Sequence, residues 1–173
     1  MPAIDFPIRR FTRRCAVSDR ALAPGEAYYS VIVEEAGDVV RRDVASDSWS
    51  SPPANALGWW RATVPLTAGT GQPAPNEVLL RLLHQWENEP HRHELRYLLA
   101  LLLLRRRVLR MGDGLQLFQP DDEDTAEPTA ALSLTGPGGV RYRIDARAPS
   151  AERRDDVKEQ LMAIVYGTGA KPA

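Results

Sequence analysis

Residues 98–104 read Leu-Leu-Ala-Leu-Leu-Leu-Leu, and this is the longest apolar run in the 173-residue chain. A helix needs about 20 apolar residues to cross a bilayer, so this run is too short to span one. A helix that is apolar on all sides is instead buried in a protein core. The run therefore predicts a central, buried helix over residues 91–109.

A second helix is expected immediately before this one. Asn76 is a favourable N-cap, because its side chain can accept a hydrogen bond from the first helical turn. Four apolar residues follow with the i, i+3, i+4, i+7 spacing of one helix face: Leu79, Leu82, Leu83 and Trp86. Residues 87–90 separate the two helices, since Pro90 is tolerated only in a first turn. We expect a short-looped αα-hairpin.

After Met111 the hydrophobic pattern has a period of two residues, which indicates strands rather than helices. Three strands are expected, over residues 114–119, 130–134 and 140–146. The last strand alternates apolar and polar side chains, so one of its faces meets a core and the other meets water. Ser150 is then expected to cap a final helix, and Gly167 to end it. Helices segregated from a small antiparallel sheet define an α+β module.

The N-terminal third of the chain has a β pattern. Residues 26–33 are apolar on both alternating faces, which predicts a strand covered on both sides. Residues 35–38 form a turn, and residues 39–44 return as the second strand of a hairpin.

Four positions around this hairpin have the spacing of zinc ligands, but most of them do not hold a ligand residue. Cysteines at positions 15, 18, 45 and 48 would form paired C-x-x-C knuckles. Only Cys15 is present, since the other positions hold Ser18, Ala45 and Ser48. One thiolate cannot hold a structural zinc ion, so we expect no bound metal and a degenerate zinc ribbon.

These patterns predict two modules of an α+β protein. A small β-rich module with the degenerate knuckle-like hairpin covers residues 1–65. Residues 66–75 form a linker rich in Gly, Thr and Pro, which disfavour regular structure. The αα-hairpin, three-stranded antiparallel sheet and C-terminal helix make up residues 76–167.

Several short motifs resemble those of a known family. They are Cys15, Ser18, Pro24-Gly25-Glu26, Tyr29-Ser30, Arg42-Asp43 and Trp49. In this order they are similar to a family of uncharacterised bacterial proteins found mainly in planctomycetes. The resemblance covers most of residues 14–166 and implies a bacterial protein whose relatives carry more knuckle cysteines. It implies no activity.

Composition favours a soluble cytoplasmic protein without a cofactor. The formal net charge is −1, which provides no overall attraction to nucleic acid or to an anionic membrane. A single cysteine fits a reducing compartment. We expect no signal peptide, because no apolar stretch follows the first arginines. No catalytic pairing of a nucleophile with a base stands out, so we do not expect an enzyme.

The tryptophans Trp49, Trp59 and Trp60 are the candidate contact surface for a protein partner, because tryptophan is enriched at binding hot spots. Trp59 and Trp60 are adjacent, so in an extended segment their side chains point to opposite sides. Packing of both inside the protein is the alternative.

Two arginine clusters suggest a nucleic-acid-binding protein as the alternative function. The first is Arg9, Arg10, Arg13 and Arg14, and the second is Arg105, Arg106, Arg107 and Arg110. A structural explanation is also open, because cations at a helix C-terminus complement its dipole. The acidic loop 120–128 is a further source of counter-charge.

Overall fold

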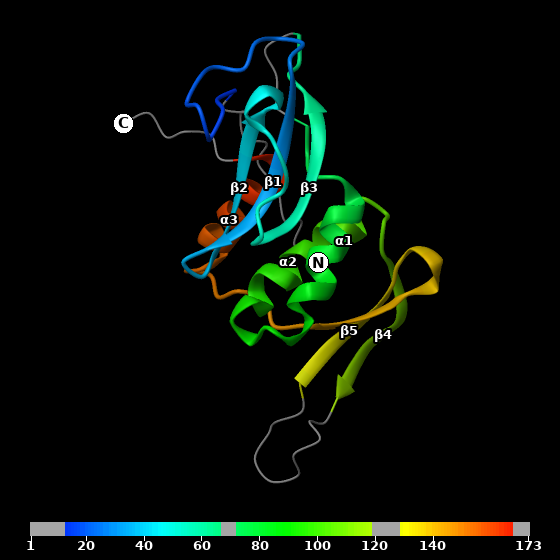
Figure 1. Ribbon diagram of the computed structural model, residues 1–173. Coiled ribbons are helices and arrows are strands. Elements are labelled where there is room, and N and C mark those ends of the chain that lie inside the picture. The colour runs from blue at the N-terminus through cyan, green and yellow to red at the C-terminus, as the bar shows by residue number, and fades with distance from the viewer. Residues whose placement is uncertain (1–12, 67–71, 119–128, 168–173) are drawn as a thin grey trace. The chain divides into compact units, whose positions relative to one another are not determined.

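The computed structural model describes residues 13–66, 72–118 and 129–167 (Figure 1). Its helices and antiparallel sheets confirm the predicted α+β class. The chain divides into two units, of which the first comprises Met1–Leu79 with Lys158–Ala173 and the second Leu80–Val157.

A three-stranded antiparallel sheet forms the centre of the first unit, with β1 between β2 and β3 (Figure 1). The strands are β1 (Ala27–Glu35), β2 (Asp38–Ala45) and β3 (Ala56–Thr63). The predicted hairpin is confirmed, and Ala36 and Gly37 turn it with φ angles of 50° and 85°. Positive φ at both turn residues matches the twist of the flanking strands. The third strand was not predicted, because its Trp-Trp pair sits between two Pro-containing stretches.

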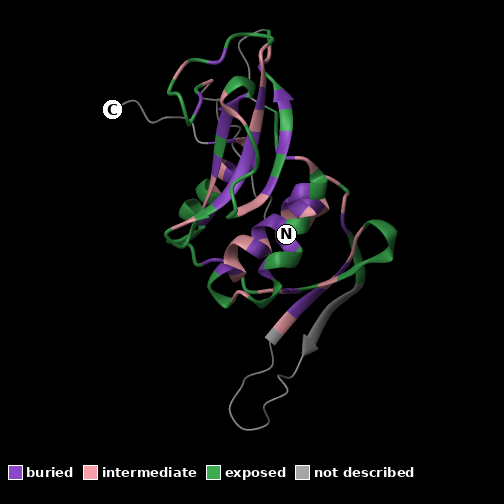
Figure 2. Ribbon diagram, in the orientation of Figure 1, coloured by how far each residue is buried: buried purple, intermediate pink, exposed green. Residues whose placement is uncertain are grey.

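Both faces of β1 are covered, as its sequence predicts. Tyr28 and Ile32 are buried on one face, and Val31 and Val33 are buried on the other. The face with Tyr28, called here the inner face, also contains a buried polar network built on Arg41. Figure 2 shows the resulting buried stretch along this strand.

The Arg41 network attaches helix α3 (Arg154–Tyr166) to the inner face. Arg41 Nη1 donates a hydrogen bond to the Val165 carbonyl at 2.7 Å, and Nη2 donates to Ser30 Oγ at 3.0 Å. Arg41 Nε lies 3.2 Å from Asp43 Oδ1, and the Ser30 hydroxyl donates to the same carboxylate oxygen. Every charged group of the network therefore has a polar partner, which a buried charge requires.

The segment before β1 forms a small hairpin of its own. Leu22 N–H donates to the Arg13 carbonyl at 2.7 Å, and Cys15 N–H donates to the Arg20 carbonyl at 2.9 Å. Ala16 N–H then donates to the carbonyl of Asp43 at 2.8 Å, which joins this hairpin to β2.

The second unit is built around helix α2. Its elements are the C-terminal part of α1 (Asn76–Gln85), α2 (His93–Arg105), β4 (Arg110–Phe118), β5 (Thr129–Thr135) and β6 (Arg141–Asp145). The strands form an antiparallel sheet in the order β4-β5-β6. Leu98, Leu99 and Leu103 of α2 are fully buried, which confirms the predicted central helix (Figure 2).

The division into units differs from the predicted modules. Helix α3 was assigned to the C-terminal module, but from Lys158 onward it groups with the first unit. Two hydrogen bonds to the Val165 carbonyl join α3 to this unit, from Arg41 and from the backbone of Ala74 at 2.7 Å. These contacts join residues about a hundred positions apart, so no local sequence pattern predicts them.

Candidate interaction site on the N-terminal sheet

Three aromatic rings cluster on the outer face of the first sheet, the face opposite Tyr28. Tyr29 of β1 stacks on Trp49, with ring centroids 4.9 Å apart and planes 8° apart. Trp59 of β3 lies 6.0 Å from Trp49 and 6.1 Å from Tyr29. Offset-stacked and tilted pairs at these distances are attractive beyond the area they bury. We call Tyr29, Trp49 and Trp59 the aromatic cluster.

The cluster presents one ring strongly to the surface. Trp59 is 45% exposed, whereas Tyr29 and Trp49 are half-buried beside it. A tryptophan held by two neighbouring rings keeps a large exposed area in one orientation. This property suits a binding contact, because little conformational entropy is lost when a partner covers it.

Trp60 does not belong to this surface, which corrects the predicted set of contact residues. It pairs with Ser30 across β1 and β3 and is only 8% exposed. The Arg41 guanidinium lies 4.7 Å from the centroid of its ring, on the inner face. Adjacent strand residues point to opposite sides, so Trp59 lies on the outer face and Trp60 on the covered inner face. Tyr29 was not among the predicted contacts, although it shares a strand face with apolar Val31.

An apolar groove borders the aromatic cluster. Its volume is about 390 Å³, and its apolar lining residues are Ala16, Val17, Val31, Val33, Val44, Trp49 and Pro53. The polar lining residues are Glu35, Arg42, Ser48, Ser50, Ser51 and Asn55. Among these lining residues, Val17 is 68% exposed, whereas Val31, Val33 and Val44 are buried. A concave, mostly apolar lining with a few polar groups is typical of binding sites.

Hydrogen bonds hold the segment 46–55 beside the sheet at both of its ends. Ser46 Oγ donates to the Ala27 carbonyl at 2.8 Å. Asn55 Nδ2 donates to the Glu34 carbonyl at 3.0 Å. Because these two carbonyls lie at opposite ends of β1, the segment spans the strand and the groove is preformed.

Arg20 adds a charged connection at the first of these ends. Its Nη2 lies 2.5 Å from Glu26 Oε1 and 2.8 Å from Asp47 Oδ2. The hydrogen bond from Arg20 holds the pKa of Glu26 below its usual range, and the Ala23 N–H acts in the same direction. Arg20 thus ties the short N-terminal hairpin to the turn that precedes Trp49.

Three of the four positions with zinc-knuckle spacing come together. Cys15 Sγ accepts hydrogen bonds from the backbone N–H groups of Ser18 at 3.4 Å and Ala45 at 3.3 Å. Ser48 lines the groove next to this turn. Burial raises the pKa of the Cys15 thiol, but hydrogen bonds from Ser18 and from the backbone outweigh burial and lower it to about 7. Within the described ranges, no group of three His, Cys, Asp or Glu side chains is placed to hold a metal.

The described members of the two predicted arginine clusters fall into different units. Arg9 and Arg10 lie outside the described residues, and Arg14 pairs with Asp19 at 2.9 Å. Arg107 and Arg110 are exposed at the end of α2 and the start of β4. The acidic segment 120–128 lies outside the described residues, so its expected pairing with these arginines stays a prediction.

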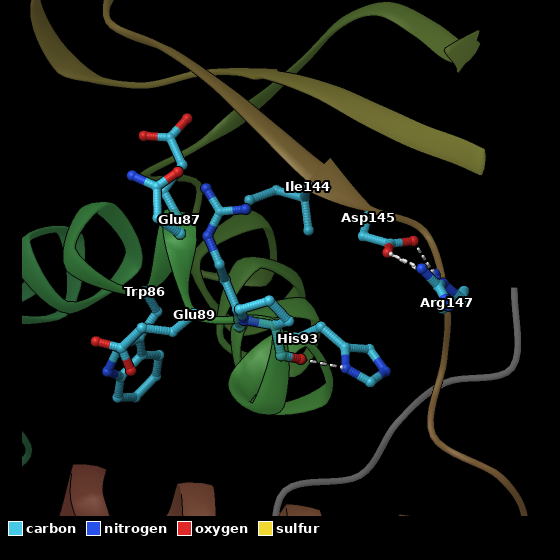
Figure 3. Close-up of a pocket in the computed structure, with 10 residues that line it drawn as sticks. Trp86, Glu87, Glu89, His93, Ile144, Asp145 and Arg147 are labelled. Atoms are coloured by element: carbon cyan, nitrogen blue, oxygen red, sulfur yellow. Dashed lines mark hydrogen bonds and ion pairs between the residues drawn. The ribbon is translucent and has the colours of Figure 1, made fainter. Parts of the chain in front are cut away.

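A second cavity, of about 450 Å³, lies in the second unit and has mixed charge (Figure 3). Asp145 lies 3.0 Å from Arg147, and Glu89 lies 2.5 Å from Arg92. Burial lowers the pKa of Arg96, another lining residue. Arg96 donates from Nε to the Leu83 carbonyl at 2.9 Å and from Nη1 to the Arg143 carbonyl at 2.7 Å. These bonds give Arg96 a structural role.

No protein-family model, no curated protein and no solved structure matches this chain. Among the described residues, no helix has the length and apolar character needed to cross a membrane.

Proposed function

We propose that this protein is a non-catalytic cytoplasmic interaction protein that binds an extended segment of a partner protein. The segment docks in the groove on the outer face of the first sheet, with Trp59 and Trp49 as its main contacts. The observation that carries the proposal is the 45% exposure of Trp59 while two neighbouring rings hold it in place.

The groove's chemistry supports a peptide as the occupant. Its buried floor consists of Val31, Val33 and Val44, which match aliphatic side chains of a partner. Three serines and Asn55 line the same groove and offer hydrogen bonds to a peptide backbone. An apolar floor with polar groups at the rim is the usual composition of a protein–protein interface.

The groove's titratable groups support binding rather than acid–base catalysis. Only Glu35 and Arg42 among its lining residues titrate, and they form an ion pair with a shortest distance of 2.5 Å. The hydrogen bond from Arg42 holds the pKa of Glu35 below its usual range, so Glu35 is a carboxylate at neutral pH. The cytoplasmic part of the proposal is supported by the free cysteine.

A selection from a library of displayed linear peptides tests this function. Peptides that bind the full chain are then titrated against Trp59→Ala by calorimetry. Loss of a hot-spot tryptophan weakens binding by about thirtyfold or more, equivalent to about 2 kcal/mol.

The matched control is Leu66→Ala, which removes an 80% exposed apolar side chain that does not line the groove. Selected peptides are expected to bind this variant as they bind the unaltered protein. Peptides whose affinity is equal for the two variants would rule out the aromatic cluster as the contact surface. An exhaustive selection that yields no binder would also count against the proposal.

A further inference from the structure

Helix α2 ends on an arginine in a conformation that favours glycine. Arg107 has a φ of 59°. The N–H of Arg107 donates to the Leu104 carbonyl at 2.9 Å, and that of Val108 donates to the Leu103 carbonyl at 2.9 Å. Helices commonly end in such a left-handed residue, and it is usually glycine because a Cβ costs energy there. Arg13, Asp19 and Ala36 have similar φ angles, so this conformation alone assigns no role, and the surroundings of the Arg107 side chain decide what it can do.

The Arg107 side chain is not needed to cap the helix. Backbone N–H groups of residues 106–109 already bond the last carbonyls of α2, including that of Leu102 at 2.9 Å. These carbonyls therefore do not need arginine side chains as partners.

A shallow pocket of about 510 Å³ opens beside Arg107. Its lining residues are Arg107, Val108, Arg110, Thr135, Gly136, Pro137, Gly138 and Gly139. A Cβ added to Gly138 or Gly139 would meet nothing within 4 Å, so the backbone of this turn is open to a ligand. The described lining thus contains two guanidinium groups, one hydroxyl and accessible backbone, without a carboxylate.

A third arginine adjoins this pocket through the register of the sheet. Thr135 pairs with Arg110 on one side and with Arg141 on the other. Residues paired across strands share one face, so both arginine side chains lie on the same face of the sheet as the Thr135 side chain. In the part of the chain that the structure describes, no carboxylate lies within ion-pair distance of Arg107, Arg110 or Arg141.

We propose that this pocket binds a phosphate group. The fork of N–H donors on a guanidinium matches phosphate oxygens, and such charge-assisted hydrogen bonds are among the strongest in proteins. The group belongs either to a small phosphorylated molecule or to a nucleic-acid backbone. The proposal does not depend on the peptide groove, which lies in the other unit.

Two probes and three variants test the site in the full chain. Inorganic pyrophosphate and a short single-stranded RNA of mixed sequence are titrated at low salt and at increasing salt. Arg107→Gly removes the guanidinium and places the preferred residue at the helix end, and Arg110→Gln removes the second one. Arg81→Gln is the matched control, because Arg81 is exposed on α1, does not line the pocket and carries the same charge.

Each pocket variant is expected to bind about tenfold more weakly than the unaltered protein, and the control is expected to bind almost as well. The urea midpoint of Arg107→Gly should equal or exceed that of the unaltered protein, which separates lost binding from lost folding. If pyrophosphate binds and competes with RNA for the pocket, the ligand is a small phosphorylated molecule. Binding of RNA alone, falling steeply with salt, identifies a nucleic-acid backbone.

Absence of binding to both probes at low salt would overturn the proposal. Equal affinities of Arg107→Gly and Arg81→Gln would do the same, because the attraction would then come from overall charge.

Discussion

Two buried arginines hold helix ends in this protein. Arg41 donates to the Val165 carbonyl in the last turn of α3, and Arg96 donates to the Leu83 carbonyl in the last turn of α1. The carbonyls at a helix C-terminus lack intrahelical partners and carry partial negative charge. A guanidinium placed there satisfies them and is itself stabilised. Arg41 has the additional advantage of a carboxylate partner, Asp43.

Removal of the Arg41 side chain is expected to destabilise the first unit strongly. Arg41→Met leaves the buried Asp43 carboxylate without its cation, and breaking a buried pair costs about 3–5 kcal/mol. Arg42→Met, which breaks the exposed pair with Glu35, is the control and should cost less than about 1 kcal/mol. Urea denaturation measures both free energies of unfolding. Similar losses in the two variants would argue against a stabilising role for the Arg41 network.

The Cys15 thiol makes a pH-dependent contribution to stability. Hydrogen bonds lower its pKa to about 7 from the ordinary value of 9.0, although burial acts against them. A pKa that is lower in the folded state means that folding favours the thiolate. This contribution is therefore fully present above pH 9.0 and is lost as the pH falls through about 7.

Comparison with Cys15→Ala isolates this contribution. The stability of the unaltered protein relative to the variant is expected to increase as the pH rises from about 7 to 9.0. Urea denaturation at several pH values measures it, and the thiolate's ultraviolet absorbance reports the titration directly. A stability difference that stays constant over this interval would contradict the lowered pKa.

Among the secondary-structure elements, β3 illustrates how pairing overrides a weak local signal. Its sequence contains Gly58 and an adjacent tryptophan pair, and neither establishes a strand alone. Pairing with β1 sets the register, in which Trp59 lies opposite Val31 and Trp60 lies opposite Ser30. This register exposes one tryptophan and buries the other.

Gly58 allows β3 to approach the start of α1. A Cβ at this position would lie 2.7 Å from Val78 Cγ1, which is closer than real contacts allow. Gly58→Ala is expected to lower the free energy of unfolding by about 1–3 kcal/mol, as overpacking does. The clash should shrink in the double variant Gly58→Ala/Val78→Ala, so a double-mutant cycle in urea should show favourable coupling. Strict additivity would mean that Val78 does not limit the space at Gly58.

In the complete chain, the first unit is assembled from both ends of the sequence. Residues 158–167 belong to it, and α3 contributes the buried side chains of Leu161, Met162, Ile164 and Val165. Burial of one such side chain contributes about 1.5–3 kcal/mol, so together they rival the total stability of a domain.

Deletion of residues 158–173 is therefore expected to unfold the first unit. Amide hydrogen exchange of β1 should become fast, and emission from the buried Trp60 should shift toward that of a solvated tryptophan. Deletion of residues 168–173 alone is the control, since it leaves α3 complete and should change neither signal. Preserved exchange protection of β1 in the longer deletion would show that the first sheet folds without α3.

Periodicity and turn residues were sufficient to predict the β1–β2 hairpin, both helices of the αα-hairpin, the second sheet and α3. Each of these elements has a hydrophobic repeat within its own few turns or strand positions, such as Leu79, Leu82 and Leu83 in α1, although α1 includes Asn76 as its first residue rather than as the expected N-cap. The alternation rule also indicated that Trp59 and Trp60 point apart.

Long-range contacts decided the rest. The strand nature of β3, the exposure of Trp59 rather than Trp60 and the union of α3 with the N-terminal sheet all depend on pairing between distant residues. Such pairing is stabilised by burial and hydrogen bonds that form only after the chain closes long loops. For that reason the local sequence determines most of the helices and strands, whereas tertiary packing determines which of their side chains are exposed to a partner.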